Sequence, residues 1–325
     1  MLVLITGGAG YIGSVTASLL VEQGYEVRIL DNLMYDNYYV VEALREKGIK
    51  DFIKGDVRDR DVLSRAMKDV DAVLHMAALV GAPVCNRHPE LTVQVNYEAT
   101  KMVGDLCQEL DVDRLVFASS TSVYGGIGGD IVVDEEGPCK PLSLYARTKL
   151  MSEEYLLGKS REEGLPVCCL RVATNYGPSL RPRLDLAINR FVYMALRYRK
   201  IEVYGGDQWR PFINTYDTAR AYQAVLEAPP GLVEGEIYNV GSTSENYRII
   251  EVAEVVGEVI PGVEITVKEE HKDLRSYRVS FRKIEEKLGF RTVKALREGI
   301  EELVDFVEAI EDPEDEKYYN YPPPS

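Results

Sequence analysis

Short apolar runs alternate with amphipathic stretches through the first half of the chain. Six runs predict β-strands: "LVLIT", "EVRILD", "DFIKGD", "DAVLHMAA", "RLVFASS" and "PVCCLRV". Helical periodicity fills the intervals, at 11–23, 37–47, 59–67, 92–110 and 144–163. Regular alternation of strand and helix predicts an α/β protein in which helices cover both faces of a parallel sheet.

The pattern loosens from about Ala173 onward. Helices are predicted near 184–199, 216–227, 248–260 and 295–309, with short strands between them. We therefore expect a doubly wound sheet domain over 1–172, to which 210–228 returns. The stretches 173–209 and 229–311 are expected to form a smaller, interwoven substrate lobe. The polar stretch 312–325 ends in prolines and is predicted to be a loosely ordered tail.

A glycine-rich loop, "TGGAGYIG", follows the first predicted strand and opens the first predicted helix. Its glycines satisfy both G-x-G-x-x-G and T-G-x-x-G-x-x-G. Glycines let the backbone turn tightly and approach a pyrophosphate at the helix N-terminus, which is typical of a Rossmann-type dinucleotide site. We expect Gly7, Gly10, Tyr11, Ile12 and Gly13 to contact the cofactor.

An acidic residue, Asp31, ends the second predicted strand, 18 residues after Gly13. A carboxylate at this place can accept both adenosine ribose hydroxyls and repels a 2′-phosphate, so NAD is favoured over NADP. Asp56 ends the third strand and either reaches the adenine or caps the following helix. The further predicted cofactor contacts are Asn32, Val57, Ala77 and Ala78.

Charge and composition exclude several classes of protein. The net charge of −15 argues against nonspecific nucleic-acid binding. Five cysteines with no C-x-x-C and three scattered histidines predict neither a disulfide framework nor a metal site. Apolar runs stay shorter than a membrane helix requires, and "MLVLIT" is interpreted as a buried strand and not as a signal peptide. We expect a cytoplasmic protein that does not contact a membrane.

Tyr145 and Lys149 in "SLYARTK" are four residues apart and therefore share one helix face. A free tyrosine has a pKa of about 10, and lowering it to about 7 takes roughly 4 kcal/mol, much of which a nearby ammonium can supply in a shielded site. In a protein that binds NAD, this spacing favours a catalytic phenolate over surface decoration. A hydroxyl donor is expected at the strand end "FASSTSVYG", where several candidates stand together.

These motifs, with "LRVATNYGP" and "DQWRPF" in the same order, resemble the extended short-chain dehydrogenase/reductase family. Within it they resemble nucleotide-sugar epimerases and dehydratases of the UDP-galactose 4-epimerase type. The resemblance implies that Ser120 is the catalytic hydroxyl and that Tyr145 takes the sugar 4-hydroxyl proton. It implies that Lys149 holds Tyr145 ionised and contacts the nicotinamide ribose. It also implies that Asn96 supports the lysine through the central helix, and Asn96 is expected among the cofactor-binding residues.

The residues after Ser120 bear on the reaction. The dehydratase branch has an Asp-Glu pair there, and the decarboxylases have Glu at the second place, whereas this chain has Thr121 and Ser122. A 4-epimerase needs no further ionisable group, so it is the leading hypothesis. A nucleotide-sugar 4-dehydrogenase or ketoreductase, or a CDP-sugar 2-epimerase, would use the same set. A noncatalytic dinucleotide sensor is the rival from another class.

The resemblance also implies a nucleotide-sugar substrate and a homodimer formed by pairing helices 92–110 and 144–163 into a four-helix bundle. Arg210 matches the diphosphate-binding arginine, although Pro211 replaces the usual Asp. Arg275 or Arg278 in "DLRSYRVSF" is expected as a second phosphate contact, and Arg275 is the one selected. Arg181 and Arg183 are equally compatible with a solvated basic loop, and the family lysine near the nicotinamide ribose is replaced by Val80. The remaining substrate contacts are expected at Ser122, Thr174 and Asn175.

Overall fold

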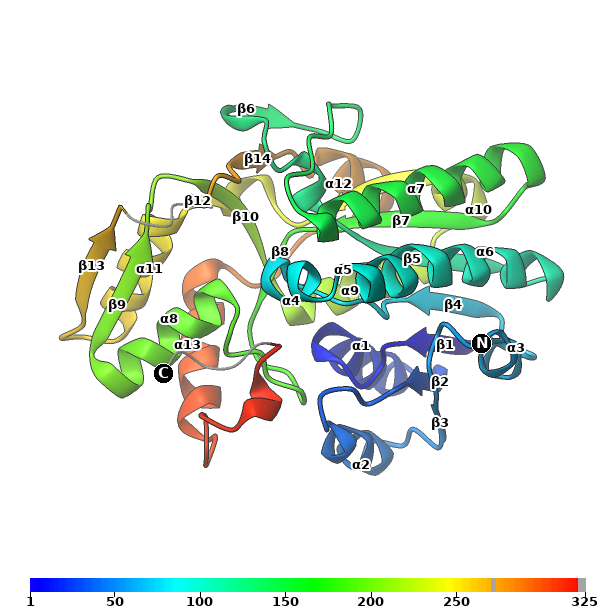
Figure 1. Cartoon of the computed structure of the whole chain (residues 1–325), viewed down its shortest axis with the longest axis horizontal. Helices are drawn as coiled ribbons and strands as arrows, with labels where there is room; N and C mark the ends of the chain where they lie inside the picture. The colour runs from blue at the N-terminus through cyan, green and yellow to red at the C-terminus, as the bar shows by residue number, and fades with distance from the viewer. Residues whose placement is uncertain (270–272, 321–325) are drawn as a thin grey trace.

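The computed structural model describes residues 1–269 and 273–320, and its centre is a seven-stranded parallel sheet (Figure 1). The strand order is β11-β7-β5-β4-β1-β2-β3. The strands are β1 (Leu2–Thr6), β2 (Glu26–Asp31), β3 (Asp51–Lys54), β4 (Ala72–His75), β5 (Arg114–Ser120), β7 (Val167–Val172) and β11 (Glu236–Val240). The order reverses between β1 and β4, and ligands bind at such switch points in doubly wound folds. The predicted Rossmann-type fold is confirmed.

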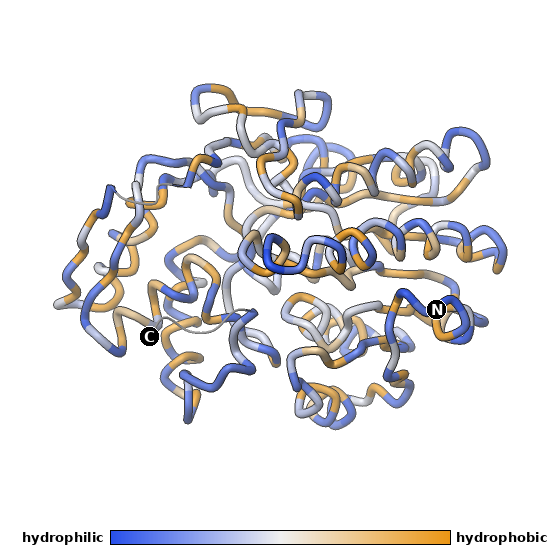
Figure 2. The backbone as a smooth tube through the Cα atoms, in the orientation of Figure 1, coloured by the Kyte–Doolittle hydropathy of each residue, from blue (hydrophilic) through white to orange (hydrophobic). Residues whose placement is uncertain are grey.

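Helices cover both faces of this sheet. α1 (Tyr11–Glu22), α2 (Tyr38–Glu46) and α9 (Thr215–Glu227) share one apolar core, to which Val3 and Ile5 of β1 contribute. α3 (Arg60–Met67), α6 (Ala99–Glu109) and α7 (Leu144–Glu163) share the core on the opposite face, to which Leu4 contributes. Successive strand residues point to opposite faces, which is why an uninterrupted apolar strand serves both cores. Figure 2 shows hydrophobic and hydrophilic positions alternating along the flanking helices.

A smaller lobe lies beside the sheet, to the left in Figure 1. It contains the three-stranded sheet of β8 (Thr174–Tyr176), β10 (Trp209–Asn214) and β12 (Asn246–Arg248), and the pair β9 (Lys200–Tyr204) and β13 (Glu264–Lys268). α8 (Ala187–Tyr198), α11 (Ile249–Val259) and α13 (Leu296–Glu308) pack around its apolar core. The other described elements are α4 (Ala82–Arg87), α5 (Pro89–Val93), β6 (Gly128–Val133), α10 (Pro230–Val233), β14 (Tyr277–Val279), α12 (Arg282–Leu288) and the short helices η1 (Gln94–Glu98), η2 (Thr121–Tyr124), η3 (Thr243–Glu245) and η4 (Glu316–Tyr318).

Three details differ from the sequence-based expectation. The stretch 229–311 contains β11, which pairs with β7 at the edge of the large sheet, so part of it does not belong to the lobe. Within 210–228, α9 packs on α1, whereas β10 belongs to the small sheet of the lobe. The predicted helix 92–110 is divided into α5, a π-helical turn η1 and α6. Short strands such as β11 carry too few residues for periodicity to assign them.

The C-terminal stretch 312–325 was predicted to be loosely ordered, but its described part packs on the protein. Tyr319 is only 4% exposed, and its hydroxyl donates to the Pro313 carbonyl at 2.9 Å. The Leu184 amide donates to the Tyr318 carbonyl at 3.0 Å. Aromatic burial within a polar sequence explains this order; residues 321–325 lie outside the described residues. None of the described helices has the length and apolar character to span a membrane.

Candidate active site

The carboxyl ends of the central strands and the lobe enclose a cavity of about 800 Å³. The glycine loop, the ends of β2, β4 and β5, the start of α7 and the segment 172–191 all contribute to its lining. The strand order reverses at this edge of the sheet, where open α/β folds bind ligands. The residues predicted from the sequence to bind cofactor or substrate are therefore expected to line this cavity.

The glycine loop can pack tightly against the strand ends and itself only because its residues lack side chains. Gly7 adopts a φ of +73°, and a Cβ there would lie 2.9 Å from the Ala77 backbone. A Cβ at Gly13 would collide with the Gly7 carbonyl. The loop and the beginning of α1 line the cavity, so free amides at the helix N-terminus can meet an anion. This arrangement fits the pyrophosphate of a dinucleotide.

Asp31 lies at the carboxyl end of β2, on the same side of the cavity. Its Oδ2 accepts from the Ala9 amide at 3.1 Å and its Oδ1 from the Leu33 amide at 2.9 Å. Burial raises the pKa of Asp31, while these two hydrogen bonds lower it. Nearby, the Asn32 amide donates to Asp56 at 3.3 Å. Every cofactor contact predicted from the sequence lines the cavity, with the exception of Asn96.

Asn96 lies behind the cavity wall, which corrects its predicted place among the cofactor contacts. Its side chain is fully buried in η1, where Oδ1 accepts from the Leu79 amide at 2.8 Å and Nδ2 donates to the Leu79 carbonyl at 2.9 Å. Nδ2 also reaches the Thr148 hydroxyl at 3.3 Å. An amide can satisfy a backbone N–H and C=O together, so Asn96 fixes the loop after β4 to α7 and positions the wall from behind.

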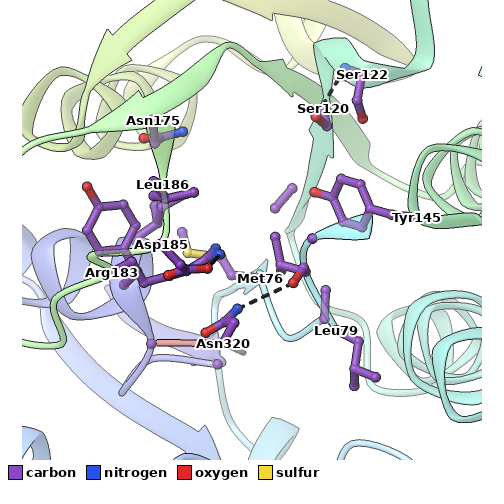
Figure 3. A pocket seen from close by; sticks show the side chains of 18 of the residues that line it. Met76, Leu79, Ser120, Ser122, Tyr145, Asn175, Arg183, Asp185, Leu186 and Asn320 are labelled. Carbon is purple, nitrogen blue, oxygen red and sulfur yellow. Dashed lines mark hydrogen bonds and ion pairs between the residues drawn. The ribbon is translucent and has the colours of Figure 1, made fainter. Parts of the chain in front are cut away.

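Ser120, Tyr145 and Lys149 meet on one wall of the cavity. Ser120 ends β5, and the other two residues lie in the first turns of α7, which Ser143 caps by accepting from the Ala146 amide at 3.2 Å. Figure 3 shows the Tyr145 hydroxyl pointing into the cavity, with Ser120 beside it. The Lys149 ammonium donates to the Ala118 carbonyl at 2.7 Å and lies 5.9 Å from the centre of the Tyr145 ring.

The side chains alone do not produce a phenolate at neutral pH. Burial raises the pKa of Tyr145 to about 12, although the Ser120 hydrogen bond and Arg183 lower it. Burial also lowers the pKa of Lys149 to about 8. Desolvation penalises the charged forms of both side chains, and the predicted lowering of the Tyr145 pKa draws on Lys149 together with the positive nicotinamide ring of bound NAD⁺. Ionisation of Tyr145 needs a further positive charge beside it.

The predicted sugar contacts face this wall or flank it. Ser122, Thr174 and Asn175 all line the cavity. The buried Ser122 hydroxyl has no hydrogen-bond partner among the described residues. The Asn175 amide donates to the Ala173 carbonyl at 3.0 Å and accepts from the Thr218 hydroxyl at 2.7 Å. An unpaired buried hydroxyl costs free energy, so Ser122 is a ready partner for a polar ligand.

Arg210 and Arg275 converge on a single carboxylate in the lobe. Asp273 accepts from Arg210 at 2.9 Å and from Arg275 at 2.6 Å, and all three residues line the cavity. The two arginines lower the pKa of Asp273 to about 2, against the effect of its burial. Two guanidinium groups against one carboxylate leave a net positive charge, which suits a second anionic group of a ligand.

Four further cavity residues were not among the site residues predicted from the sequence. Arg181 and Arg183 are only 2% and 6% exposed, so they are not part of a solvated basic loop. Tyr222 of α9 is fully buried, and its hydroxyl has no partner among the described residues. Asn320 reaches the cavity from the C-terminal stretch. The clustered cations in "RPR" were the only signal available in the sequence.

Several proteins of known type resemble this chain over almost its whole length. A putative UDP-glucose 4-epimerase of Methanocaldococcus jannaschii is 30% identical over 310 residues, which cover 94% of this chain and 98% of the relative. The UDP-glucose 4-epimerase of Thermus thermophilus, solved in complex with NAD, is 29% identical with a TM-score of 0.82, covering 95% of this chain and 99% of that one.

A dehydratase is equally similar in structure. The dTDP-glucose 4,6-dehydratase DesIV of Streptomyces venezuelae, solved with NAD and TYD bound, is 28% identical with a TM-score of 0.84, covering 95% of this chain and 97% of that one. Residues 3–241 match the model of the NAD dependent epimerase/dehydratase family. The predicted cofactor, NAD, and the predicted family are thereby confirmed. The chain belongs to the NAD dependent epimerase/dehydratase family.

Proposed function

We propose that the protein is a 4-epimerase of a nucleotide-diphosphate sugar of the UDP-glucose/UDP-galactose type. The observation that carries the proposal is the meeting of Ser120, Tyr145 and Lys149 on one cavity wall, next to hydroxyl groups and not acids at the two following positions. Relatives and structural neighbours named as UDP-glucose 4-epimerases support the same reaction.

In this proposal the Tyr145 phenolate accepts the proton of the sugar 4-hydroxyl as C4 becomes a carbonyl carbon. NAD, when bound, supplies the acceptor and then the donor of the C4 hydride. The Ser120 hydroxyl donates to the oxygen that becomes the ketone. Lys149 holds positive charge below the phenol, and Tyr145 returns its proton once the ketone has presented its other face. No atom is gained or lost, so the product is an isomer.

Elimination of water would require an extra acid and base near the sugar. Thr121 is turned away, because its hydroxyl donates to the Val172 carbonyl at 3.4 Å. Among the described carboxylates that line the cavity, Asp56, Asp185, Glu202 and Asp273 each lie in an ion pair, and Asp31 lies beside the glycine loop. This arrangement favours epimerisation over dehydration.

The test is incubation of the full chain with UDP-, GDP-, CDP- and dTDP-sugars, followed by mass spectrometry and NMR of the products. We expect a UDP-hexose of unchanged mass with an inverted C4 configuration and no accumulation of reduced nicotinamide. Steady accumulation of NADH would favour a dehydrogenase, and loss of a water's mass would favour a dehydratase. Inversion at C2 of a CDP-sugar would point to the 2-epimerase alternative.

We further propose that the protein is a homodimer formed through α6 and α7. These helices lie side by side on one face of the sheet, and Met151 of α7 is 39% exposed. Two such pairs can pack into a four-helix bundle. Sedimentation velocity should give a dimer that Met151→Glu dissociates, whereas a wild-type monomer would refute the arrangement.

A further inference from the structure

Arg181 is a cation buried in the cavity wall, and two of its hydrogen bonds to described residues go to neutral acceptors. Its Nη1 donates to the Asn320 side-chain oxygen at 2.6 Å and its Nη2 to the Tyr319 carbonyl at 3.4 Å. Its guanidinium carbon lies 4.1 Å from the centre of the Tyr35 ring. Its Nε is buried and has no partner among the described residues. These hydrogen bonds go to neutral groups, while the carboxylates of Asp185 and Asp31 interact with the Arg181 guanidinium electrostatically.

The other buried arginines of the cavity are arranged differently. Arg183 donates to Asp185 at 3.0 Å, and Arg210 lies 2.9 Å from Asp273. Burial and the neighbouring Arg183 lower the pKa of Arg181 to about 10, although Asp185 raises it, and the group stays charged at neutral pH. Burial of a cation whose hydrogen-bond acceptors are neutral is costly even with a carboxylate nearby, and an anionic ligand would offset that cost.

The position of Arg181 indicates which anion it meets. Ser179, two residues earlier, donates to the Tyr11 carbonyl at 2.7 Å, at the start of α1. The Tyr11 hydroxyl in turn donates to the Gly177 carbonyl at 2.8 Å. Arg181 also lowers the pKa of Asp31, at the end of β2. Arg181 thus lies at the glycine-loop end of the cavity, whereas Arg210 and Arg275 lie in the lobe.

We propose that Arg181 binds the diphosphate of NAD from the lobe side, and that the C-terminal segment 318–320 positions it. The cavity then has two cationic sites for two diphosphates. Arg181 serves the cofactor together with the amides of the glycine loop. Arg210 and Arg275 serve the substrate. The inference rests on the use of NAD and not on the outcome of the sugar reaction.

The C-terminal segment is placed to hold this arginine. Asn320 accepts from Arg181 and donates to the Val80 carbonyl at 3.4 Å, so it ties the lobe to the loop after β4. Figure 3 shows Asn320 on the side of the cavity opposite Ser120. Lys317 lies 5.6 Å from the centre of the Tyr39 ring, a further link to the sheet domain. The segment 318–320 can therefore hold the Arg181 guanidinium at the glycine-loop end of the cavity.

The test compares two variants of the full chain by isothermal titration calorimetry. Arg181→Met keeps the length of the side chain but removes its charge, and Arg210→Met does the same at the other site. We expect Arg181→Met to weaken binding of both NAD⁺ and ADP-ribose by roughly 30-fold or more, as loss of a buried charge partner does. Binding of UDP should stay within about twofold. Arg210→Met should show the opposite selectivity, with UDP binding about tenfold weaker and NAD⁺ binding within about twofold of the wild type.

A role in tail attachment alone predicts something else: lower thermal stability of the cofactor-free chain, with unchanged NAD⁺ affinity. That result would overturn the proposal. It would also be overturned if Arg181→Met weakened the binding of adenosine, which has no phosphate, as much as the binding of NAD⁺. If Arg181→Met does not fold, Asn320→Ala provides the second test. We expect this variant to bind NAD⁺ several-fold more weakly and to bind UDP with unchanged affinity. Unchanged NAD⁺ affinity would contradict the positioning role of Asn320. These binding results do not depend on epimerase activity.

Discussion

The two walls of the cavity hold their charged groups in different ways. On the sheet side, Ser120, Tyr145 and Lys149 come from one strand end and the helix that packs beside it, and Lys149 is anchored on a backbone carbonyl. On the lobe side, the arginines depend on distant partners: Arg181 on Asn320 and Arg210 on Asp273. The residues proposed for the chemistry are therefore placed by neighbouring elements, whereas the arginines proposed for binding are placed by contacts between distant parts of the chain.

This contrast gives a rule for mutations. Changes on the sheet wall should alter turnover and leave affinities nearly unchanged, and changes on the lobe wall should alter affinities selectively.

Tyr145→Phe should give the largest effect. Removing the hydroxyl removes the proton acceptor, and loss of a positioned acid-base group costs about 10² to 10⁴ in rate. Turnover is measured by NMR of the sugar product. The control is NAD⁺ affinity, which should stay close to that of the wild type because the backbone of the cofactor site is unchanged. Retention of wild-type turnover would remove Tyr145 from the reaction.

Lys149→Met should separate stability from activity. The pKa of Lys149 falls from 10.5 to about 8 on folding, so the unfolded chain binds more protons between these values. The contribution of this group to the free energy of unfolding therefore rises as the pH increases from about 8 to 10.5. At pH 7 the variant, free of cofactor, should be more stable by up to about 3 kcal/mol, and at pH 10 by much less.

Urea unfolding at the two pH values measures this difference, while turnover of the same variant should fall. Lower stability at pH 7, or a difference independent of pH, would show that burial of the ammonium is not costly. The two measurements together test whether burial of the Lys149 ammonium lowers the stability of the chain while it supports turnover.

Arg210→Met and Arg275→Met test the lobe wall. Each leaves Asp273 paired with one arginine, so the local charge falls from net positive to near neutral. We expect UDP to bind about tenfold more weakly to each variant, a cost of about 1.4 kcal/mol, with turnover at saturating substrate little changed. Calorimetry with UDP and steady-state kinetics give the two numbers. A fall in turnover at saturating substrate with unchanged UDP affinity would contradict this expectation. It would show that these arginines act in the reaction, as is expected of the residues on the sheet side of the cavity.

Ser122→Ala should give the smallest effect. The buried hydroxyl has no partner among the described residues, so its removal should change the free energy of unfolding by less than about 1 kcal/mol. Sugar-nucleotide KM should rise a few-fold. Ser119→Ala is the matched control, because the Ser119 hydroxyl donates to buried Glu153 and its loss should destabilise the chain. Equal destabilisation by both variants would mean that Ser122 is also structural.

The same contrast explains what could be predicted from the sequence. The glycine loop, Asp31 and the Tyr145–Lys149 pair carry their geometry in spacing along one strand or one helix, and all of them line the cavity. Asn96 was selected, but its place behind the wall depends on the π-helical turn in η1, which periodicity does not reveal. Arg181 and Asn320 are separated by 139 positions, and no local pattern joins them.

The domain boundary at β11 and the packing of the C-terminal stretch could not be predicted from the sequence for the same reason, because both depend on contacts between distant residues. β11 has five residues and gains its place by pairing with β7, a contact that the sequence does not state. The C-terminal stretch is polar overall, yet the burial of Tyr319 against the lobe orders its described part. Tertiary burial outweighed local composition in both cases.

The most direct test of the central claim uses UDP-glucose carrying deuterium at C4. The hydride that leaves C4 is proposed to return to the same carbon from the other face, with Tyr145 handling only the hydroxyl proton. The account predicts UDP-galactose with the deuterium retained at C4, and no more than a trace of labelled product from Tyr145→Phe. Loss of the deuterium to water, or a product lighter by one water molecule, would contradict it.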